Sequence, residues 1–203
     1  MKIIFSYAAL SALIMLVCFT AYAQKPEMKI GYNFNTPVSN SFKNFISNTS
    51  FRGFNGELAY PVNNLLIGVG VSYSDFYQKY PRQVVATKDG NISAVVSNSV
   101  QTIPILAKAT YNFSKKGLLR PYAALGAGMN FVQYTHYLGE FADAKSTLKP
   151  AVQGDAGVNI FVSELRGSGI NVGASFNYLP FNYSETKNLN NWGVHAGIFF
   201  LLR

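Results

Sequence analysis

Hydrophobic and polar residues alternate with a period of two along most of the chain, and helical periodicity is nearly absent. Such alternation predicts strands whose successive side chains point to opposite faces of a sheet. In one clear case, Ile170, Val172 and Ala174 alternate with Asn171 and Gly173. Eight segments of this kind are separated by Gly, Asn, Pro and Ser clusters: 28–35, 52–60, 65–77, 101–113, 120–134, 150–162, 169–180 and 191–202.

The connections between these segments alternate between short and long. Short links lie at 61–64, around 115–117 and at 164–168, whereas the longest loop, 78–100, is polar and contains Asp89-Gly90. The 3.6-residue spacing of apolar residues within 38–47 predicts a helical turn in the first long loop. One end of the structure is therefore trimmed and the other elaborated, which is typical of outer-membrane barrels, and an even strand number returns both termini to the trimmed end.

The N-terminus has the layout of a secretory signal peptide. Lys2 is followed by an apolar run from Ile3 to about Thr20 and then by Ala21-Tyr22-Ala23, a small-x-small pattern. Cleavage after Ala23 would remove residues 1–23 and leave 24–203 as a single barrel domain; an uncleaved membrane anchor is the alternative. The remaining chain contains no cysteine, since Cys18 lies in the leader, and so has neither disulfides nor thiolate metal sites.

The polar face of the strands consists mainly of Gly, Asn, Ser and Thr, with few charges. These small residues make a poor water-exposed surface but suit the narrow interior of an eight-stranded barrel. Aromatic residues lie near strand ends, as expected for two girdles at the membrane interfaces: Tyr60, Tyr73, Phe76, Tyr77, Tyr111, Phe113, Tyr122, Tyr134, Tyr178 and Trp192. We therefore predict an all-β fold, an eight-stranded antiparallel up-and-down transmembrane β-barrel. The alternative is a secreted, soluble lipocalin-like barrel with the apolar face inside.

Charge is scarce. Only 13% of residues are charged, yet the 17 Lys and Arg exceed the 9 Asp and Glu, which gives a net charge of +8. A sequence pI near 9.5 raises nucleic acid as a partner, but the positive charges divide between the two ends of the predicted barrel and form no basic stripe. We assign six cations and two acids to the trimmed, periplasmic end. The cations are Lys25, Lys115, Lys116, Arg120, Arg166 and Arg203, and the acids are Glu27 and Glu164. We assign eight cations and five acids to the outer end. The cations are Lys43, Arg52, Lys79, Arg82, Lys88, Lys145, Lys149 and Lys187, and the acids are Asp75, Asp89, Glu140, Asp143 and Glu185.

The outer cations suggest lipopolysaccharide as a partner, since Lys and Arg bind phosphate; simple solvation of the loops is the alternative.

Five ionisable residues fall on the predicted lumen face: Lys29, Glu57, Lys108, Asp155 and His195. Unpaired charges in a narrow interior are strongly unfavourable. We therefore expect these residues to form a structural network of salt bridges and hydrogen bonds that plugs the barrel. The alternative is that each lies near a rim and is solvated.

The sequence contains few residues in arrangements that would support catalysis or cofactor binding. The only histidines are His136 and His195, and no serine neighbours them in sequence to form a nucleophile–base pair. No phosphate-binding or dinucleotide-binding glycine pattern occurs at a strand-to-helix turn. We predict no enzyme activity, no cofactor and no metal.

The run from Arg120 to Phe131, together with the preceding Tyr111-Asn112-Phe113, resembles the outer membrane protein beta-barrel domain family, whose relatives include the OmpA transmembrane domain, OmpX and OmpW. The resemblance covers essentially the whole chain after the leader. It implies a small monomeric barrel in the outer membrane of a Gram-negative bacterium, inserted by the barrel assembly machinery after export through the periplasm, with no shared catalytic residues. The chain ends in Phe199-Phe200-Leu201-Leu202-Arg203, so its aromatic residues lie slightly inboard of the terminal position that is usual in such barrels.

We therefore predict a non-catalytic envelope protein with a polar, plugged lumen that acts through its surface loops or as an envelope component. One alternative is an OmpW-like transporter or channel for a small apolar ligand. It would use the apolar residues on the lumen face, Leu66, Pro104, Leu106 and Phe161.

Overall fold

The structure is a computed structural model that describes residues 25–87, 90–114, 116–163, 167–184 and 186–202. The predicted signal peptide lies outside the described residues. So do several charged positions that the sequence assigns to the two ends: Lys88, Asp89, Lys115, Glu164, Arg166, Glu185 and Arg203.

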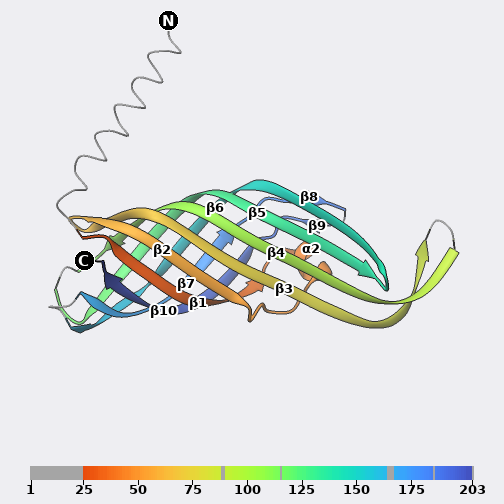
Figure 1. Cartoon of the computed structure of the whole chain (residues 1–203), viewed down its shortest axis with the longest axis horizontal. Helices are drawn as coiled ribbons and strands as arrows, with labels where there is room; N and C mark the ends of the chain where they lie inside the picture. Colours follow the sequence, from red (N-terminus) through yellow and green to blue (C-terminus); the bar gives the residue numbers. More distant parts are fainter. Residues whose placement is uncertain (1–24, 88–89, 115, 164–166, 185, 203) are drawn as a thin grey trace, which may run out of the picture.

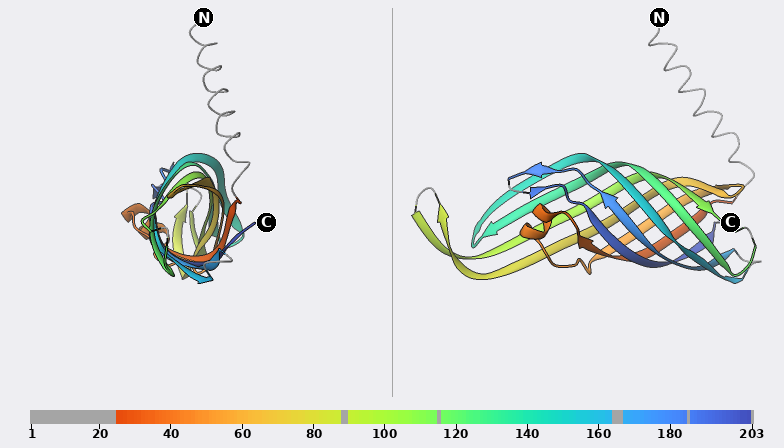
Figure 2. Two further views of the ribbon diagram at one scale, coloured as in Figure 1. Left: turned by 90° about the vertical axis from the view of Figure 1, so that its left-hand side faces the viewer. Right: turned by 180° about the vertical axis from the view of Figure 1, so that it is seen from behind.

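Eight long strands form a closed antiparallel ring (Figures 1 and 2). They are β1 (Glu27–Pro37), β2 (Gly53–Val62), β3 (Leu65–Thr87), β4 (Gly90–Asn112), β5 (Leu119–Leu138), β6 (Phe141–Ser163), β7 (Ser168–Tyr178) and β10 (Asn191–Leu201). Sequence neighbours pair around the ring, and β1 closes it by pairing with β10 from Glu27↔Leu201 to Pro37↔Asn191. The predicted eight-stranded up-and-down barrel is confirmed.

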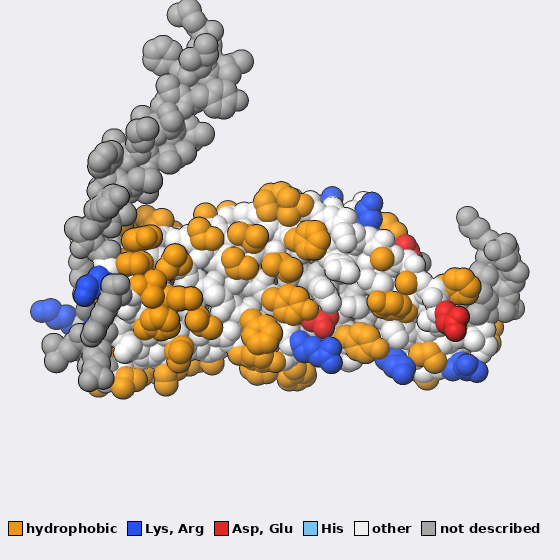
Figure 3. Space-filling model, viewed as in Figure 1, with side chains coloured by type: hydrophobic (Ala, Val, Ile, Leu, Met, Phe, Trp, Pro, Cys, Tyr) orange, Lys and Arg blue, Asp and Glu red, His pale blue; other side chains and the backbone are white. Residues whose placement is uncertain are grey.

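The apolar face of the strands points outward. Large hydrophobic side chains are exposed around the ring: Ile30, Val69, Ile105, Leu125, Val152, Val172 and Ile198. In Figure 3 such side chains cover the middle of the barrel wall, while charged side chains gather towards its ends. This surface matches a lipid environment, and the lipocalin-like orientation with the apolar face inside is wrong.

No helix in the described part of the chain is both long enough and apolar enough to cross a membrane.

The outer ends of β3 to β6 extend beyond the other strands as a projecting wall (Figure 2). The expected loop 78–100 is therefore wrong: β3 and β4 stay paired from Lys79↔Ser97 to Thr87↔Gly90, with a register shift between Lys79 and Arg82. Likewise, β5 and β6 stay paired up to Leu138↔Phe141. Pairing satisfies the backbone donors and acceptors of these segments outside the barrel proper, so two apparent loops are hairpins.

The start of β1 at Glu27 and the end of β10 at Leu201 both lie at the trimmed end, beside the turn between β2 and β3, as predicted (Figure 1). The turn between β2 and β3 is only Asn63-Asn64, where Asn63 adopts a positive φ of 59°. Asparagine is among the few residues that adopt this conformation readily. The trimmed end is therefore the periplasmic end of the barrel.

Three aromatic residues assigned to the girdles lie inside the barrel instead. Phe76, Tyr122 and Tyr134 are almost completely buried. Each occupies a lumen-facing position of its strand. On β5, for example, Tyr122 and Tyr134 are at even-numbered positions, whereas the outward-facing Leu125 and Met129 are at odd-numbered positions. Whether a residue is at an even or an odd position of its strand decides on which side of the barrel wall its ring lies. Its distance from the strand end does not.

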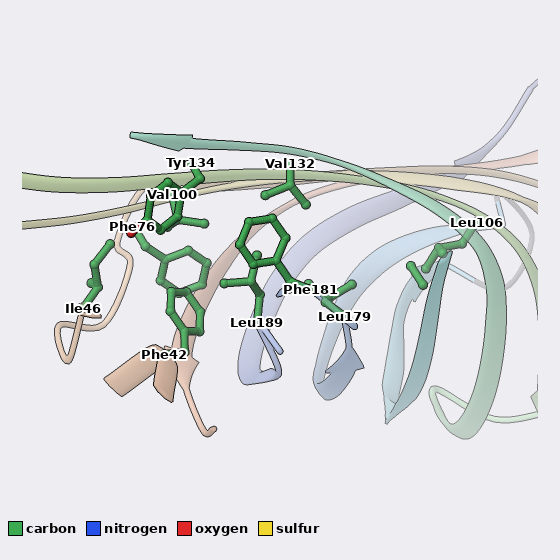
Figure 4. Packing of buried hydrophobic residues seen from close by; sticks show 11 residues of the cluster. Phe42, Ile46, Phe76, Val100, Leu106, Val132, Tyr134, Leu179, Phe181 and Leu189 are labelled. Carbon is green, nitrogen blue, oxygen red and sulfur yellow. The ribbon is translucent and has the colours of Figure 1, made fainter. Parts of the chain in front are cut away.

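The outer mouth is filled by two folded loops. The predicted helical turn is confirmed as α2 (Asn40–Phe45), and the loop between β7 and β10 forms a small hairpin from β8 (Asn182–Tyr183) and β9 (Thr186–Lys187). Their apolar side chains meet lumen side chains of β3, β4 and β5 in one buried cluster, which we call the outer plug (Figure 4). Its members are Phe42, Ile46, Phe76, Val100, Leu106, Val132, Tyr134, Ala151, Leu179, Phe181 and Leu189.

Hydrogen bonds tie both loops to the projecting wall. The carbonyl oxygen of Phe45, at the end of α2, accepts from Asn98 Nδ2 at 2.7 Å and from Tyr80 Oη at 3.1 Å. On the other side, Tyr183 Oη donates to Asp143 Oδ1 at 2.8 Å, which raises the pKa of the Tyr183 phenol above its usual value. The plug is thus held by polar contacts at its rim and by apolar packing at its centre.

We expect Leu125→Arg to destabilise the barrel by about 2–4 kcal/mol, the cost of a cation at the lipid-facing midplane. Leu125 is 71% exposed on the barrel wall. The measurement is reversible urea unfolding of the protein folded into phospholipid vesicles. Val84→Arg is the matched control, because Val84 is 70% exposed on the projecting wall, and it should change stability by less than about 0.5 kcal/mol. Equal effects of the two variants would contradict the outward-facing lipid surface.

Candidate functional site

A layer of ionisable side chains crosses the lumen below the outer plug. Lys108 on β4 lies at its centre, with its Nζ 2.7 Å from Glu57 Oε2 on β2 and 3.9 Å from Asp155 Oδ2 on β6. Lys29 on β1 lies 4.0 Å from Glu57 Oε1. The layer therefore bridges opposite sides of the barrel wall.

His195 joins this layer from β10. Its Nε2 lies 3.0 Å from the Tyr122 hydroxyl of β5 and 3.8 Å from Asp155 Oδ2. A glycine on the wall makes room for the pair: a Cβ added at Gly173 would lie 2.6 Å from Tyr122 Oη and 2.8 Å from His195 Nε2. The five residues named from the sequence are thus brought together, and Tyr122 is a sixth member.

Space for the Lys108 side chain comes from a glycine on the neighbouring strand. A Cβ added at Gly70 would lie 2.7 Å from Lys108 Cδ, closer than real Cβ atoms approach. The stem of Lys108 therefore lies across the bare backbone of β3 and reaches the carboxylates on β2 and β6. Small residues on the lumen face are what allow a long side chain to span so narrow a barrel.

Glu27 lies at the periplasmic end, as the sequence predicts, but it faces inward and is not exposed at the rim. Its side chain is buried in the lumen, 3.5 Å from Lys29 Nζ. It lies two residues before Lys29, so the alternation of β1 already placed it on the lumen face. Glu27 therefore adds a further carboxylate to the lumen beside Lys29, and Arg120 lines the same cavity at the periplasmic end.

A small polar cavity adjoins the layer on its outer side. It is lined by Asn33, Asn55, Glu57, Asp155 and Gln153, among others. The side-chain oxygens Oδ1 of Asn33, Asn55 and Asp155 are buried and have no hydrogen-bond partner among the described residues. Such a cluster of acceptors suits small hydrogen-bond donors such as water.

The apolar lumen residues do not form a continuous path. Leu106 belongs to the outer plug, whereas Leu66 and Phe161 line a separate cavity at the periplasmic end, together with Glu27 and Arg120. There Phe161 packs edge-on against Phe199 at 4.7 Å, and the Arg120 guanidinium lies over its ring at 3.8 Å. The charged layer lies between these two apolar regions.

His136 is not part of the layer. It lies at the rim of the plug, where its Nδ1 is 2.6 Å from Asn98 Oδ1. Within the described residues, no group of three or more His, Cys, Asp or Glu side chains could hold a metal ion. The histidines therefore belong to two separate polar clusters.

Residues 9–200 match the model of a family described as outer membrane protein beta-barrel domain. The chain belongs to this family. Its location is accordingly the bacterial outer membrane, with lipid around the barrel wall.

Solved structures show the same fold. Neisserial surface protein A is 18% identical, with a TM-score of 0.55 over 87% of this chain and 96% of that one. The outer membrane protein OprG of Pseudomonas aeruginosa is 11% identical, with a TM-score of 0.55 over 89% and 97%. No curated protein matches the sequence. Identities this low establish the fold alone, and function has to be argued from the residues.

We expect Lys108→Met to destabilise the folded barrel by about 3–5 kcal/mol, because it leaves buried carboxylates without their partner. The double variant Lys108→Met/Glu57→Met should recover a substantial part of this loss, since it removes charge of both signs. Unfolding in urea in vesicles gives the values. Lys116→Met, at an exposed periplasmic turn, is the control and should be neutral within about 0.5 kcal/mol. A neutral Lys108→Met would show that the layer is solvated.

Proposed function

We propose that the protein is a non-catalytic component of the outer membrane whose lumen is closed and whose contacts with other molecules are made by its outer surface. The observation that carries this proposal is the double closure of the lumen. The ion-paired layer around Lys108 lies in the barrel, and the apolar outer plug lies above it. A structural role for Lys29, Glu57, Lys108, Asp155 and His195 is part of the same proposal.

The two closures differ in physical character, and this difference supports a permanently closed lumen. An ion or polar solute that passed the charged layer would meet the plug, where it would lose its hydration among side chains such as Phe42 and Leu189. An apolar ligand that entered at Leu66 and Phe161 would meet the charged layer instead. Neither class of solute has a compatible route through both.

The outer end offers the remaining surface for function. Its described cations, Lys43, Arg52, Lys79, Arg82, Lys145, Lys149 and Lys187, outnumber Asp75, Glu140 and Asp143. This surplus supports phosphate groups of lipopolysaccharide as the partner. In this proposal the protein is exported, loses residues 1–23, is inserted by the barrel assembly machinery and remains a monomer without nucleic-acid partners.

Planar-bilayer recordings test the closed lumen. We expect no steady conductance from the folded wild-type protein. A matched variant, in which α2 and the β8–β9 hairpin are replaced by short Gly-Ser turns and Lys108 and Glu57 are both serine, should conduct and so show the size of an open-lumen signal. Steady conductance of the wild type at a comparable level would overturn the proposal.

The processing step has its own test. Mass spectrometry of the protein isolated from outer membranes should give a polypeptide that begins at Gln24, because the Ala21-Tyr22-Ala23 pattern directs cleavage after Ala23. An Ala23→Leu variant should accumulate uncleaved. Recovery of a wild-type chain that retains the apolar leader would contradict cleavage.

A further inference from the structure

The segment that enters β2, Phe51-Arg52, is held firmly at the outer edge of the barrel. Just before it, Ser50 forms a reciprocal backbone pair with Asn35 of β1, with N···O distances of 3.1 and 2.7 Å. On the other side, the Asp75 amide of β3 donates to the Arg52 carbonyl at 3.1 Å, and the Tyr32 hydroxyl donates to the Phe51 carbonyl. These bonds fix the backbone against β1 and β3, so the positions of the two side chains relative to the barrel are defined.

An aromatic cluster surrounds this segment on the outside of the barrel; its members are Tyr32, Phe34, Phe51, Phe54 and Tyr73. Their rings follow one another in contact, at centroid distances from 5.1 Å between Tyr32 and Phe34 to 6.5 Å between Phe54 and Tyr73. Phe51 is 65% exposed and Phe54 is 59% exposed. Rings this exposed would be costly in water, so the aromatic cluster indicates the level at which the wall meets lipid chains.

Arg52 lies directly beside this aromatic cluster, between Phe51 and Phe54 in sequence. It is two residues outward of Phe54, or roughly 7 Å along an extended strand. Its side chain is 72% exposed, whereas the side chain of its partner Asp75 is only 13% exposed. Asp75 Oδ2 accepts from Nη1 at 3.3 Å. A guanidinium has five N–H donors, so a side chain that is 72% exposed keeps donors accessible besides the one that Asp75 accepts.

We propose that Arg52 and the aromatic cluster form a binding site for a phosphorylated lipid of the outer leaflet. The guanidinium donates to the headgroup phosphate, and the Phe51 and Phe54 rings contact the first part of an acyl chain. Arginine suits this role because its planar fork forms paired hydrogen bonds to phosphate oxygens. This inference deepens the proposed outer-surface function and rests on it.

Asp75 positions the arginine and also competes with the ligand. Its carboxylate holds Arg52 against the rim and offsets part of its charge. Removal of the carboxylate should therefore leave the guanidinium free for phosphate. The Asp75→Asn variant thus separates recognition of phosphate by Arg52 from mere stabilisation of the rim by the ion pair.

The test is a binding titration of the folded, detergent-solubilised protein with lipid A, the phosphorylated glycolipid of the outer leaflet, and with its enzymatically dephosphorylated form. We expect the wild type to bind the phosphorylated form more tightly by about tenfold, the value of one charge-assisted hydrogen-bond pair. Arg52→Gln should abolish this preference, and Asp75→Asn should preserve or increase it. Phe51→Ser should weaken binding of both forms.

Lys116→Gln is the control, since Lys116 is an exposed cation at the trimmed end, away from the outer cations proposed to meet phosphate. A cooperative unfolding transition, measured for each variant without added lipid, shows that the variant is folded before its binding is compared. An unchanged preference in Arg52→Gln, an equal loss in Lys116→Gln or equal binding of both lipid forms by the wild type would each overturn the site. None of these outcomes depends on whether the lumen conducts, so failure of the site is distinguishable from failure of the closed-lumen proposal.

Discussion

The whole structure depends on the need to pair every backbone donor and acceptor within a lipid environment. An unpaired backbone group costs several kcal/mol in hydrocarbon, so a sheet that spans the bilayer has to close on itself. Here the closure is the pairing of β1 with β10, which runs from Glu27↔Leu201 to Pro37↔Asn191. Closure with eight strands also sets a narrow interior. Because the interior is narrow, Lys108 needs the bare backbone of Gly70 beside it and has to pair with carboxylates. The resulting ion-paired layer interrupts any continuous apolar path through the lumen.

A narrow interior makes every charge inside it dependent on a partner. Lys108 is compatible with the lumen because Glu57 and Asp155 reach it from the two sides. Glu27 adds a further carboxylate beside Lys29 at the periplasmic end, and Tyr122 and His195 form a hydrogen bond next to Asp155. The layer is therefore better regarded as one coupled unit than as a set of separate ion pairs, because each member contacts a group that another member also uses.

Outside the bilayer the constraint changes, and so does the architecture. Backbone groups there can bind water, so the ring no longer needs to be complete. Only β3 to β6 continue, as the projecting wall, and the space beside them is filled by α2 and the β8–β9 hairpin. The outer plug is thus a small hydrophobic core of the kind found in soluble proteins, built on the end of a membrane barrel. The proposed lipid site at Arg52 lies where the lipid-facing wall meets the water-exposed outer end. Its exposed rings are on the lipid side and its guanidinium is on the aqueous side.

The sequence by itself determined the strands and the two faces, because alternation is a local property of consecutive residues. It therefore placed Lys29, Glu57, Lys108, Asp155 and His195 on one face and predicted the helical turn at α2. The same alternation also gives the lumen side for Glu27, Phe76, Tyr122 and Tyr134, although their positions near strand ends suggest the rim or the girdles. Only the tertiary structure decided which lumen residues meet, since the contact between Lys108 and Asp155 depends on the register of several strands around the closed ring. It also decided that residues 78–100 continue as paired strands and that two distant loops share one apolar core, because both depend on contacts between segments far apart in the chain.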